Sequence, residues 1–151
     1  MKSRSSKTWL FAAALALAVA LPAAAIDHKA IDAPAAILYD TPSTKGKKLF
    51  ILRRYTPLEV IVAVEGFTKV REPEGAIGWV EKKALTDQRH VIVTAAKAQV
   101  RAAASSDATL VFEAEKGVAM ELVEPAKDGW AKVRHLSGVD GMVRVTQVWG
   151  L

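Results

Sequence analysis

One pattern of residues occurs twice in this 151-residue chain, and it constrains the fold more than any other feature. The first copy reads GFTKVR at residues 66–71 and GWV at 78–80; the second reads GWAKVR at 129–134 and GMV at 141–143. In both copies the two glycines stand twelve residues apart, and the second copy follows the first by 63 residues. A pattern repeated at this distance predicts two homologous units of about 60 residues each.

Short apolar and β-branched stretches predict that both units are built from strands. In the first half these stretches lie at residues 37–40, 49–52, 58–64, 67–71 and 77–81, and they recur in the second half at 98–101, 110–112 and 118–123 and in the second hairpin. Another such stretch, at residues 91–94, lies between the units and is too apolar for a flexible linker. We therefore predict an all-β protein whose two units pack as a compact pair.

The N-terminal segment has the three parts of a secretory signal. Three cations come first, an apolar run of thirteen residues extends from Trp9 to Leu21, and three alanines follow at 23–25. The run is shorter than the roughly 20 residues that a membrane-spanning helix needs. We predict a cleaved signal peptide at residues 1–25, export to the periplasm or another extracytoplasmic compartment, and no stable membrane insertion afterwards. The rest of the chain divides into a short leader at 26–33 and domains at 34–87 and 88–151.

The charge of the exported chain argues against a nucleic-acid partner. The whole chain carries 21 Lys and Arg against 16 Asp and Glu, but three of the cations and none of the acids lie in the first 25 residues. That leaves 18 cations against 16 acids, a net charge of +2. Nucleic-acid-binding domains need a much larger basic surplus gathered on one face.

The sequence offers no arrangement typical of a catalytic or metal site. It has no cysteine, and its three histidines lie in the expected leader (His28), between the units (His90) and in an expected hairpin turn (His135). Metal-binding histidines normally stand at short, regular spacings. We therefore expect no enzymatic activity, no cofactor and no metal ion.

The motifs of the two copies resemble those of the bacterial SH3-like domain. The second copy carries Val100-Arg101-Ala102, Lys116-Gly117 and the repeated GWAKVR and GMV segments, in which Met142 replaces the usual aromatic residue. The first copy matches fully at GWV but has Tyr55-Thr56-Pro57 where a Lys-Gly turn is common. The resemblance covers residues 34–151 and implies two small barrels of five to six short strands each. It also implies a protein that binds rather than catalyses, with cell-wall (peptidoglycan) peptides or glycan as the commonest proposed ligands.

Alternation along the repeated strand predicts one outward face in each unit. Because Val70 and Val133 are the apolar positions that should point inward, the aromatic and cationic residues should point outward. These candidate ligand-binding residues are Phe67, Lys69, Arg71 and Trp79 in the first unit and Trp130, Lys132 and Arg134 in the second. Exposed rings beside cations could stack on a sugar or peptide and pair with its carboxylates. The alternative is that the rings cover the barrel edge and the cations are merely solvated.

Other features leave further alternatives open. Residues 45–54 carry five cations and no acid, whereas 107–116 carry three acids and one cation, so the units are expected to differ in role. The basic stretch could attract anionic lipid or polymer or be a solvated loop. The strand that contains Tyr39 is similar to the tyrosine-bearing strand of the polyproline groove in eukaryotic relatives. Trp149, near the C-terminus, could cover the second barrel or form an exposed hook for a partner.

These observations together favour a monomeric, non-catalytic binding module of the cell envelope. Its expected ligand is a cell-wall fragment, held by the outward aromatic and basic strands. The alternative is a structural or adaptor protein that binds another envelope protein. A cell-wall hydrolase, or a regulator of one, is a third class.

Overall fold

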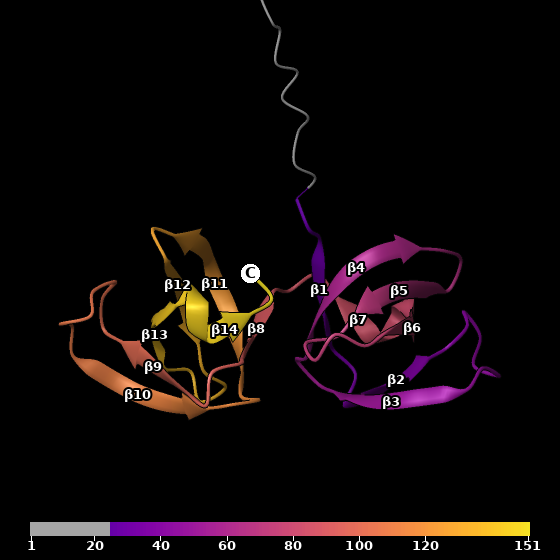
Figure 1. The fold of residues 1–151 in the computed structure, drawn as a ribbon, viewed down its shortest axis with the longest axis horizontal. Helices are drawn as coiled ribbons and strands as arrows, with labels where there is room; N and C mark the ends of the chain where they lie inside the picture. The colour runs from indigo at the N-terminus through magenta and orange to yellow at the C-terminus, as the bar shows by residue number, and fades with distance from the viewer. Residues whose placement is uncertain (1–24) are drawn as a thin grey trace, which may run out of the picture.

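The computed structural model describes residues 25–151, and in this part of the chain it contains strands, two short 3-10 turns and no α-helix (Figure 1). The predicted signal peptide lies outside the described residues, apart from Ala25. No helix among residues 25–151 is long and apolar enough to cross a membrane.

The first unit is a seven-stranded antiparallel sheet. Its strands are β1 (His28–Ile31), β2 (Ala35–Tyr39), β3 (Lys48–Arg53), β4 (Pro57–Ala63), β5 (Phe67–Arg71), β6 (Ile77–Glu81) and β7 (Leu85–Thr86). They are ordered β3-β2-β6-β5-β4-β1-β7, and the 3-10 turn η1 (Lys82–Ala84) connects β6 to β7.

The second unit repeats this topology strand for strand. Its strands are β8 (His90–Val93), β9 (Lys97–Arg101), β10 (Leu110–Glu115), β11 (Ala119–Lys127), β12 (Trp130–Arg134), β13 (Asp140–Arg144) and β14 (Val148–Trp149), with η2 (Val145–Gln147) before β14. Their order is β10-β9-β13-β12-β11-β8-β14, which is the order of the first sheet. The predicted pair of homologous all-β units is confirmed.

The segment expected to be a leader is part of the first sheet. β1 lies within residues 26–33, pairs with β4 and β7, and buries Ala30 and Ile31 completely. It corresponds to β8, because His28 and His90 stand 62 residues apart in equivalent strands. The expectation that 26–33 lies outside the first domain is therefore wrong. A four-residue strand with a single large apolar side chain leaves too little alternation to recognise.

The two glycines of the repeated pattern serve different purposes. Gly66 and Gly129 have φ of 74° and 81°, a left-handed conformation that favours glycine before the hairpin strand. Gly78 has an ordinary φ, but a Cβ there would lie 2.7 Å from Cγ of Leu38. At Gly141 the distance to Cγ1 of Val100 would be 2.4 Å. The first glycine of each copy thus allows a turn, and the second allows two strands to cross closely.

Each unit has its own core, made by the inward side chains that the alternation predicts. Val70 is fully buried with Leu38 and Val80 in the first unit, and Val133 is fully buried with Val100 in the second. The lysines and arginines that alternate with these valines are only partly buried. The prediction that β5 and β12 point their valines inward and their cations outward is confirmed.

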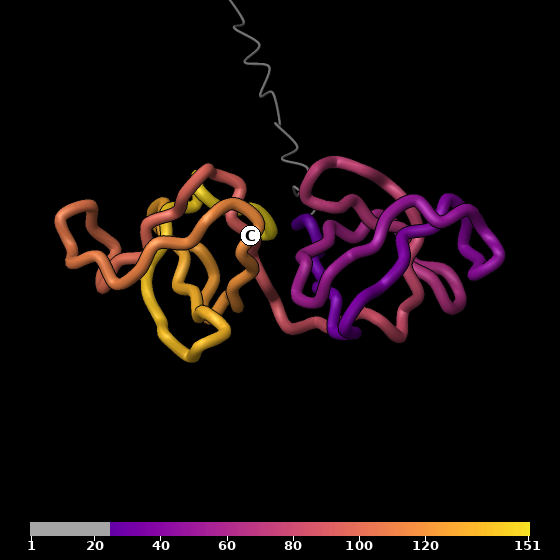
Figure 2. Tube along the Cα trace, turned by 90° about the horizontal axis from the view of Figure 1, so that it is seen from below, coloured from indigo at the N-terminus to yellow at the C-terminus, as the bar shows by residue number. Residues whose placement is uncertain are grey.

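The two units lie side by side and contact each other directly (Figures 1 and 2). The Tyr55 ring stacks on His90, with centroids 4.7 Å apart and planes at 20°. The Trp149 ring meets His28 edge-on at 5.4 Å, and Arg89, which donates a hydrogen bond from Nη2 to the carbonyl oxygen of Gly150 (2.9 Å), places the same Nη2 3.5 Å from Nδ1 of His28. Trp149 therefore takes part in the contact between the units and is not a free hook.

Candidate functional site

The outward face of the first unit brings together side chains from three strands. Lys69 on β5 stands opposite Trp79 on β6, and Trp79 stands opposite Tyr39 on β2. Residues directly opposite in neighbouring antiparallel strands share one face of the sheet. Phe67 joins them from β5, with its ring edge-on to Tyr39 at 6.3 Å. We call Tyr39, Phe67, Lys69 and Trp79 the aromatic row.

The single cation of the aromatic row has no acidic partner. Nζ of Lys69 lies 5.8 Å from the centre of the Trp79 ring, and Lys69 forms no ion pair with any described residue. Arg71, further along β5, differs from it. Its Nη1 donates to both carboxylate oxygens of Glu59, at 2.8 and 2.9 Å. Of the cations expected on this strand, Lys69 is the one left available to a ligand.

A groove of about 400 Å³ adjoins the aromatic row. It is lined by Ala33, Ala35, Ala36, Ile37, Tyr39, Glu81, Lys83 and Ala84. The alanine side chains make part of its lining small and apolar, and the lining also includes the ion pair between Lys83 and Glu81 (2.8 Å). Tyr39 is itself only 5% exposed but borders both the groove and the partly exposed rings of Phe67 and Trp79, so we call the groove and the aromatic row together the first-unit site.

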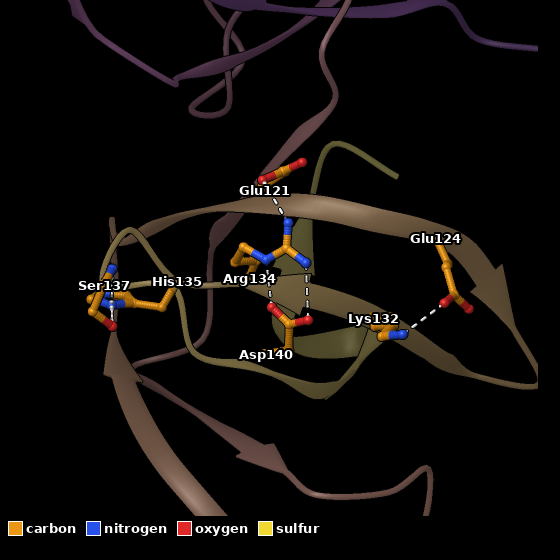
Figure 3. A network of polar contacts seen from close by, with 7 residues as sticks. All are labelled: Glu121, Glu124, Lys132, Arg134, His135, Ser137 and Asp140. Atoms are coloured by element: carbon orange, nitrogen blue, oxygen red, sulfur yellow. Dashed lines mark hydrogen bonds and ion pairs between the residues drawn. The ribbon is translucent and has the colours of Figure 1, made fainter.

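On the corresponding face of the second unit, the cationic side chains form ion pairs with carboxylates of the same unit (Figure 3). Nζ of Lys132 lies 2.8 Å from Glu124, and Nε of Arg134 lies 2.6 Å from Asp140. Arg134 also approaches Glu121 at 3.8 Å. Hydrogen bonding to Glu124 raises the pKa of Lys132, and hydrogen bonding to Arg134 lowers the pKa of Asp140. These cations are already neutralised by the protein.

Trp130 is not the exposed ring that the alternation predicts. Only 7% of the residue is exposed, because the Arg144 guanidinium lies over its ring at 4.6 Å from the centre. Arg144 also donates a hydrogen bond to the Ser106 hydroxyl. The first unit has Glu81 at the position of Arg144, so no cation covers Phe67 in this way. Trp130 therefore lies on the outer side of its sheet, as predicted, but Arg144 covers its ring.

The groove at the equivalent position of the second unit is small, at about 80 Å³, although a separate hollow of about 340 Å³ borders Trp130, Lys132 and Met142. The small groove is lined by Gln99, Arg101, Ser106, Trp130, Arg144 and Gln147, of which Gln99, Arg101, Arg144 and Gln147 occupy the positions of Ile37, Tyr39, Glu81 and Ala84. Nη1 of Arg101 donates to the Ala108 carbonyl at 2.8 Å, and Nη2 donates to Oε1 of Gln99 at 2.6 Å. Long polar side chains thus occupy the space that alanine and tyrosine leave open in the first unit.

The histidines take structural positions in the fold. His28 and His90 lie at the contact between the units, and Nδ1 of His135 is 2.8 Å from the Ser137 hydroxyl in the turn between β12 and β13 (Figure 3). Within residues 25–151 no group of three or more His, Asp or Glu side chains is placed to hold a metal ion.

The groove beside the aromatic row was not predicted from the sequence. Its signal lay in comparing the copies position by position, because Glu81 against Arg144 and Ile37 against Gln99 are the substitutions that separate an open groove from a filled one. Because the prediction rested mainly on residues that the two copies share, it treated Trp79 and Trp130 alike.

The solved structures that match this chain belong to longer proteins. NlpC2 from Trichomonas vaginalis matches with a TM-score of 0.39 and 14% identity over 83% of this chain and 48% of that chain. NlpC1 from the same organism has a TM-score of 0.39, 14% identity and coverages of 82% and 45%. An NlpC/P60 family protein from Bacillus cereus has a TM-score of 0.37, 17% identity and coverages of 80% and 55%. The chain therefore spans about half the length of these proteins.

The sequence itself was compared with curated proteins and with protein families. No curated protein matches the chain. The bacterial SH3 domain family matches it twice, at residues 32–87 and 94–150, which together make up most of its length. The chain belongs to the bacterial SH3 domain family and carries two tandem copies of its domain.

Proposed function

We propose that this protein is a non-catalytic binding module of the cell envelope, and that its first unit holds a peptide or glycan fragment of the cell wall. The observation that carries the proposal is the difference between the two copies. The first-unit site has an open groove of about 400 Å³ beside aromatic rings and an unpaired lysine. The equivalent groove of the second unit measures about 80 Å³ and is filled by arginine and glutamine side chains, and the larger hollow beside Trp130 and Met142 (about 340 Å³) is bordered by a lysine that is already paired with Glu124.

The chemistry of the first-unit site suits a wall fragment. Aromatic faces stack on the apolar faces of sugars and peptides, and Phe67 and Trp79 are the partly exposed rings of the row. Lys69 would pair with a carboxylate of the ligand, a stronger interaction than a neutral hydrogen bond. The ion pair of Glu81 and Lys83 offers both an acceptor and a donor at the rim of the groove.

The proposed location outside the cytoplasm rests on the secretory signal predicted at residues 1–25. The second unit has another role in this proposal. Its side chains Lys132, Arg134 and Trp130 contact Glu124, Asp140 and Arg144, so they stabilise the second sheet instead of binding a ligand.

Sedimentation with purified sacculi tests the proposal, using residues 26–151 and matched substitutions in the two copies. We expect the wild type to sediment with the sacculi. Trp79→Ala should weaken binding by about tenfold, as expected when one stacking ring is lost. Met142→Ala, the same position in the second unit, should leave binding unchanged. Lys69→Ala and Lys132→Ala form a second matched pair: the first should weaken binding and the second should leave it unchanged.

Two results would overturn the proposal. A wild-type protein that stays in solution with sacculi would reject the cell-wall ligand. Equal loss from Trp79→Ala and Met142→Ala would reject the assignment to the first unit. Reproducible recovery of one envelope protein, without sedimentation on sacculi, would favour the adaptor alternative.

A further inference from the structure

Each sheet ends in a strand with one unpaired edge. β3 is the end strand of the first sheet and β10 is the end strand of the second, and each has six residues. The backbone groups of residues 48–52 and 110–114 form no hydrogen bonds outside their own sheets. Figure 1 shows both strands along the lower margin of the molecule, at the outer edge of their units. A strand edge of this kind is a template for pairing with another strand.

Both edges also expose apolar side chains. Phe50 and Ile51 on β3 are 55% and 75% exposed. Leu110 and Val111 on β10 are 43% and 40% exposed. Apolar residues beside an unpaired edge favour association, because pairing would cover them together with the free backbone groups.

The two edges carry opposite charge. Residues 45–54, on and around β3, include Lys45, Lys47, Lys48, Arg53 and Arg54 and no acid, whereas residues 107–116, on and around β10, include Asp107, Glu113 and Glu115 and a single cation, Lys116. Within residues 25–151, Lys48 and Arg53 form no ion pair, and neither do Asp107 and Glu115. The charges that remain free on one edge are thus complementary to those on the other.

We propose that the protein associates head to tail with further copies of itself, with β3 of one molecule pairing with β10 of the next. Two β3 edges would bring like cations together, and two β10 edges like acids, so only the mixed pairing is electrostatically favourable. Within one molecule the two strands border separate sheets and do not pair with each other.

The proposed contact joins two different surfaces, so each pairing leaves one β3 and one β10 edge free. Association can therefore continue beyond a dimer. A series of linked copies presents several first-unit sites at once, but the contact itself does not depend on the ligand of that site. This outcome differs from the monomer expected from the sequence.

Sedimentation velocity of residues 26–151 tests the contact through charge reversal. The sedimentation coefficient of the wild type should rise with protein concentration at about 20 mM salt and fall back at about 500 mM, where charges are screened within a few ångströms. Lys48→Glu/Arg53→Glu replaces both cations of β3 itself by acids and lowers the net charge of residues 45–54 from +5 to +1, and Asp107→Lys/Glu115→Lys changes the net charge of residues 107–116 from −2 to +2. Because all four residues are exposed and free of ion pairs, neither change should disturb the fold. Each double variant alone should associate at least about tenfold more weakly than the wild type.

Mixing the two double variants provides the rescue. In the mixture the unchanged β3 of one variant can pair with the unchanged β10 of the other, and the acids introduced on β3 face the lysines introduced at the β10 edge, so the mixture should associate more strongly than either component alone. A wild type with a constant sedimentation coefficient at low salt would overturn the proposal. Association that survives both reversals, or a mixture that stays monomeric while both variants show the wild-type circular dichroism spectrum, would overturn it as well.

Discussion

Tyr55 adopts a backbone conformation that a residue with a side chain normally avoids, and its ring compensates for the cost. Its φ is 67°, and the equivalent residue of the second unit is Gly117, with φ of 88°. This conformation costs a non-glycine residue about 1–2 kcal/mol. In return the ring stacks on His90 at 4.7 Å and lies under the Arg54 guanidinium at 5.0 Å. Each such aromatic contact contributes about 0.5–1.5 kcal/mol.

Two substitutions at this position separate the backbone cost from the ring contacts. Tyr55→Ala removes the contacts and keeps the strained backbone, so the free energy of unfolding should fall by about 1–2 kcal/mol. Tyr55→Gly loses the same contacts but relieves the backbone, so it should be more stable than Tyr55→Ala by about 1 kcal/mol. With a typical urea dependence, the midpoints of the two variants should differ by about 0.5 M.

Urea denaturation followed by circular dichroism measures this difference. Gly117→Ala is the matched control, because it introduces the backbone cost without touching a ring, and it should lose about 1 kcal/mol. A midpoint for Tyr55→Gly equal to or below that of Tyr55→Ala would refute the reasoning, since it would mean that the left-handed backbone of Tyr55 carries no cost.

Two further predictions concern the contact between the units and the crossing glycines. Burial, followed by the nearby Arg89 guanidinium, lowers the pKa of His28 below its usual value of about 6.5, despite the opposing charges of Glu59 and Asp27. The free energy of unfolding should therefore be highest above about pH 6.5 and should decrease as the pH falls toward the lowered pKa of His28. Urea titrations at several pH values measure this decrease, and His28→Phe should make it smaller. An unchanged pH dependence in His28→Phe would contradict the assignment to His28. Gly78→Ala, which forces a Cβ to 2.7 Å from the Tyr39 carbonyl oxygen, should cost about 1–3 kcal/mol by the same assay, and a loss below that of Gly66→Ala would count against the close crossing.

Much of the fold could be predicted because a strand with one buried face needs regular alternation. Val70 in the first copy and Val133 in the second point inward, so the neighbouring Lys69 and Lys132 must lie on the outer face of their sheets. The repeat made the inference firmer, since two copies with the same spacing are unlikely to share a pattern by chance. The same reasoning missed β1, whose four residues include only one large apolar side chain.

The candidate site could be predicted only in part, because exposure depends on neighbours from other strands. Alternation correctly placed Trp79 and Trp130 on the outer side of their sheets, but it could not show that Arg144 lies across Trp130. The groove likewise depends on small residues of β2 facing η1, which are adjacent only after folding. The contact between His28 and Trp149 joins residues more than a hundred positions apart, beyond the reach of any local pattern.

The proposed function requires that the first unit binds the ligand and that the second unit does not. The side-chain N–H signals of the tryptophans in residues 26–151 test it directly, because Trp79 lies in the first-unit site, Trp130 lies under Arg144, and Trp149 lies between the units. In a titration with soluble cell-wall fragments, followed by ¹H–¹⁵N NMR, we expect the Trp79 signal to move while the Trp130 and Trp149 signals stay in place. A shift of Trp130 with a stationary Trp79 would contradict the account.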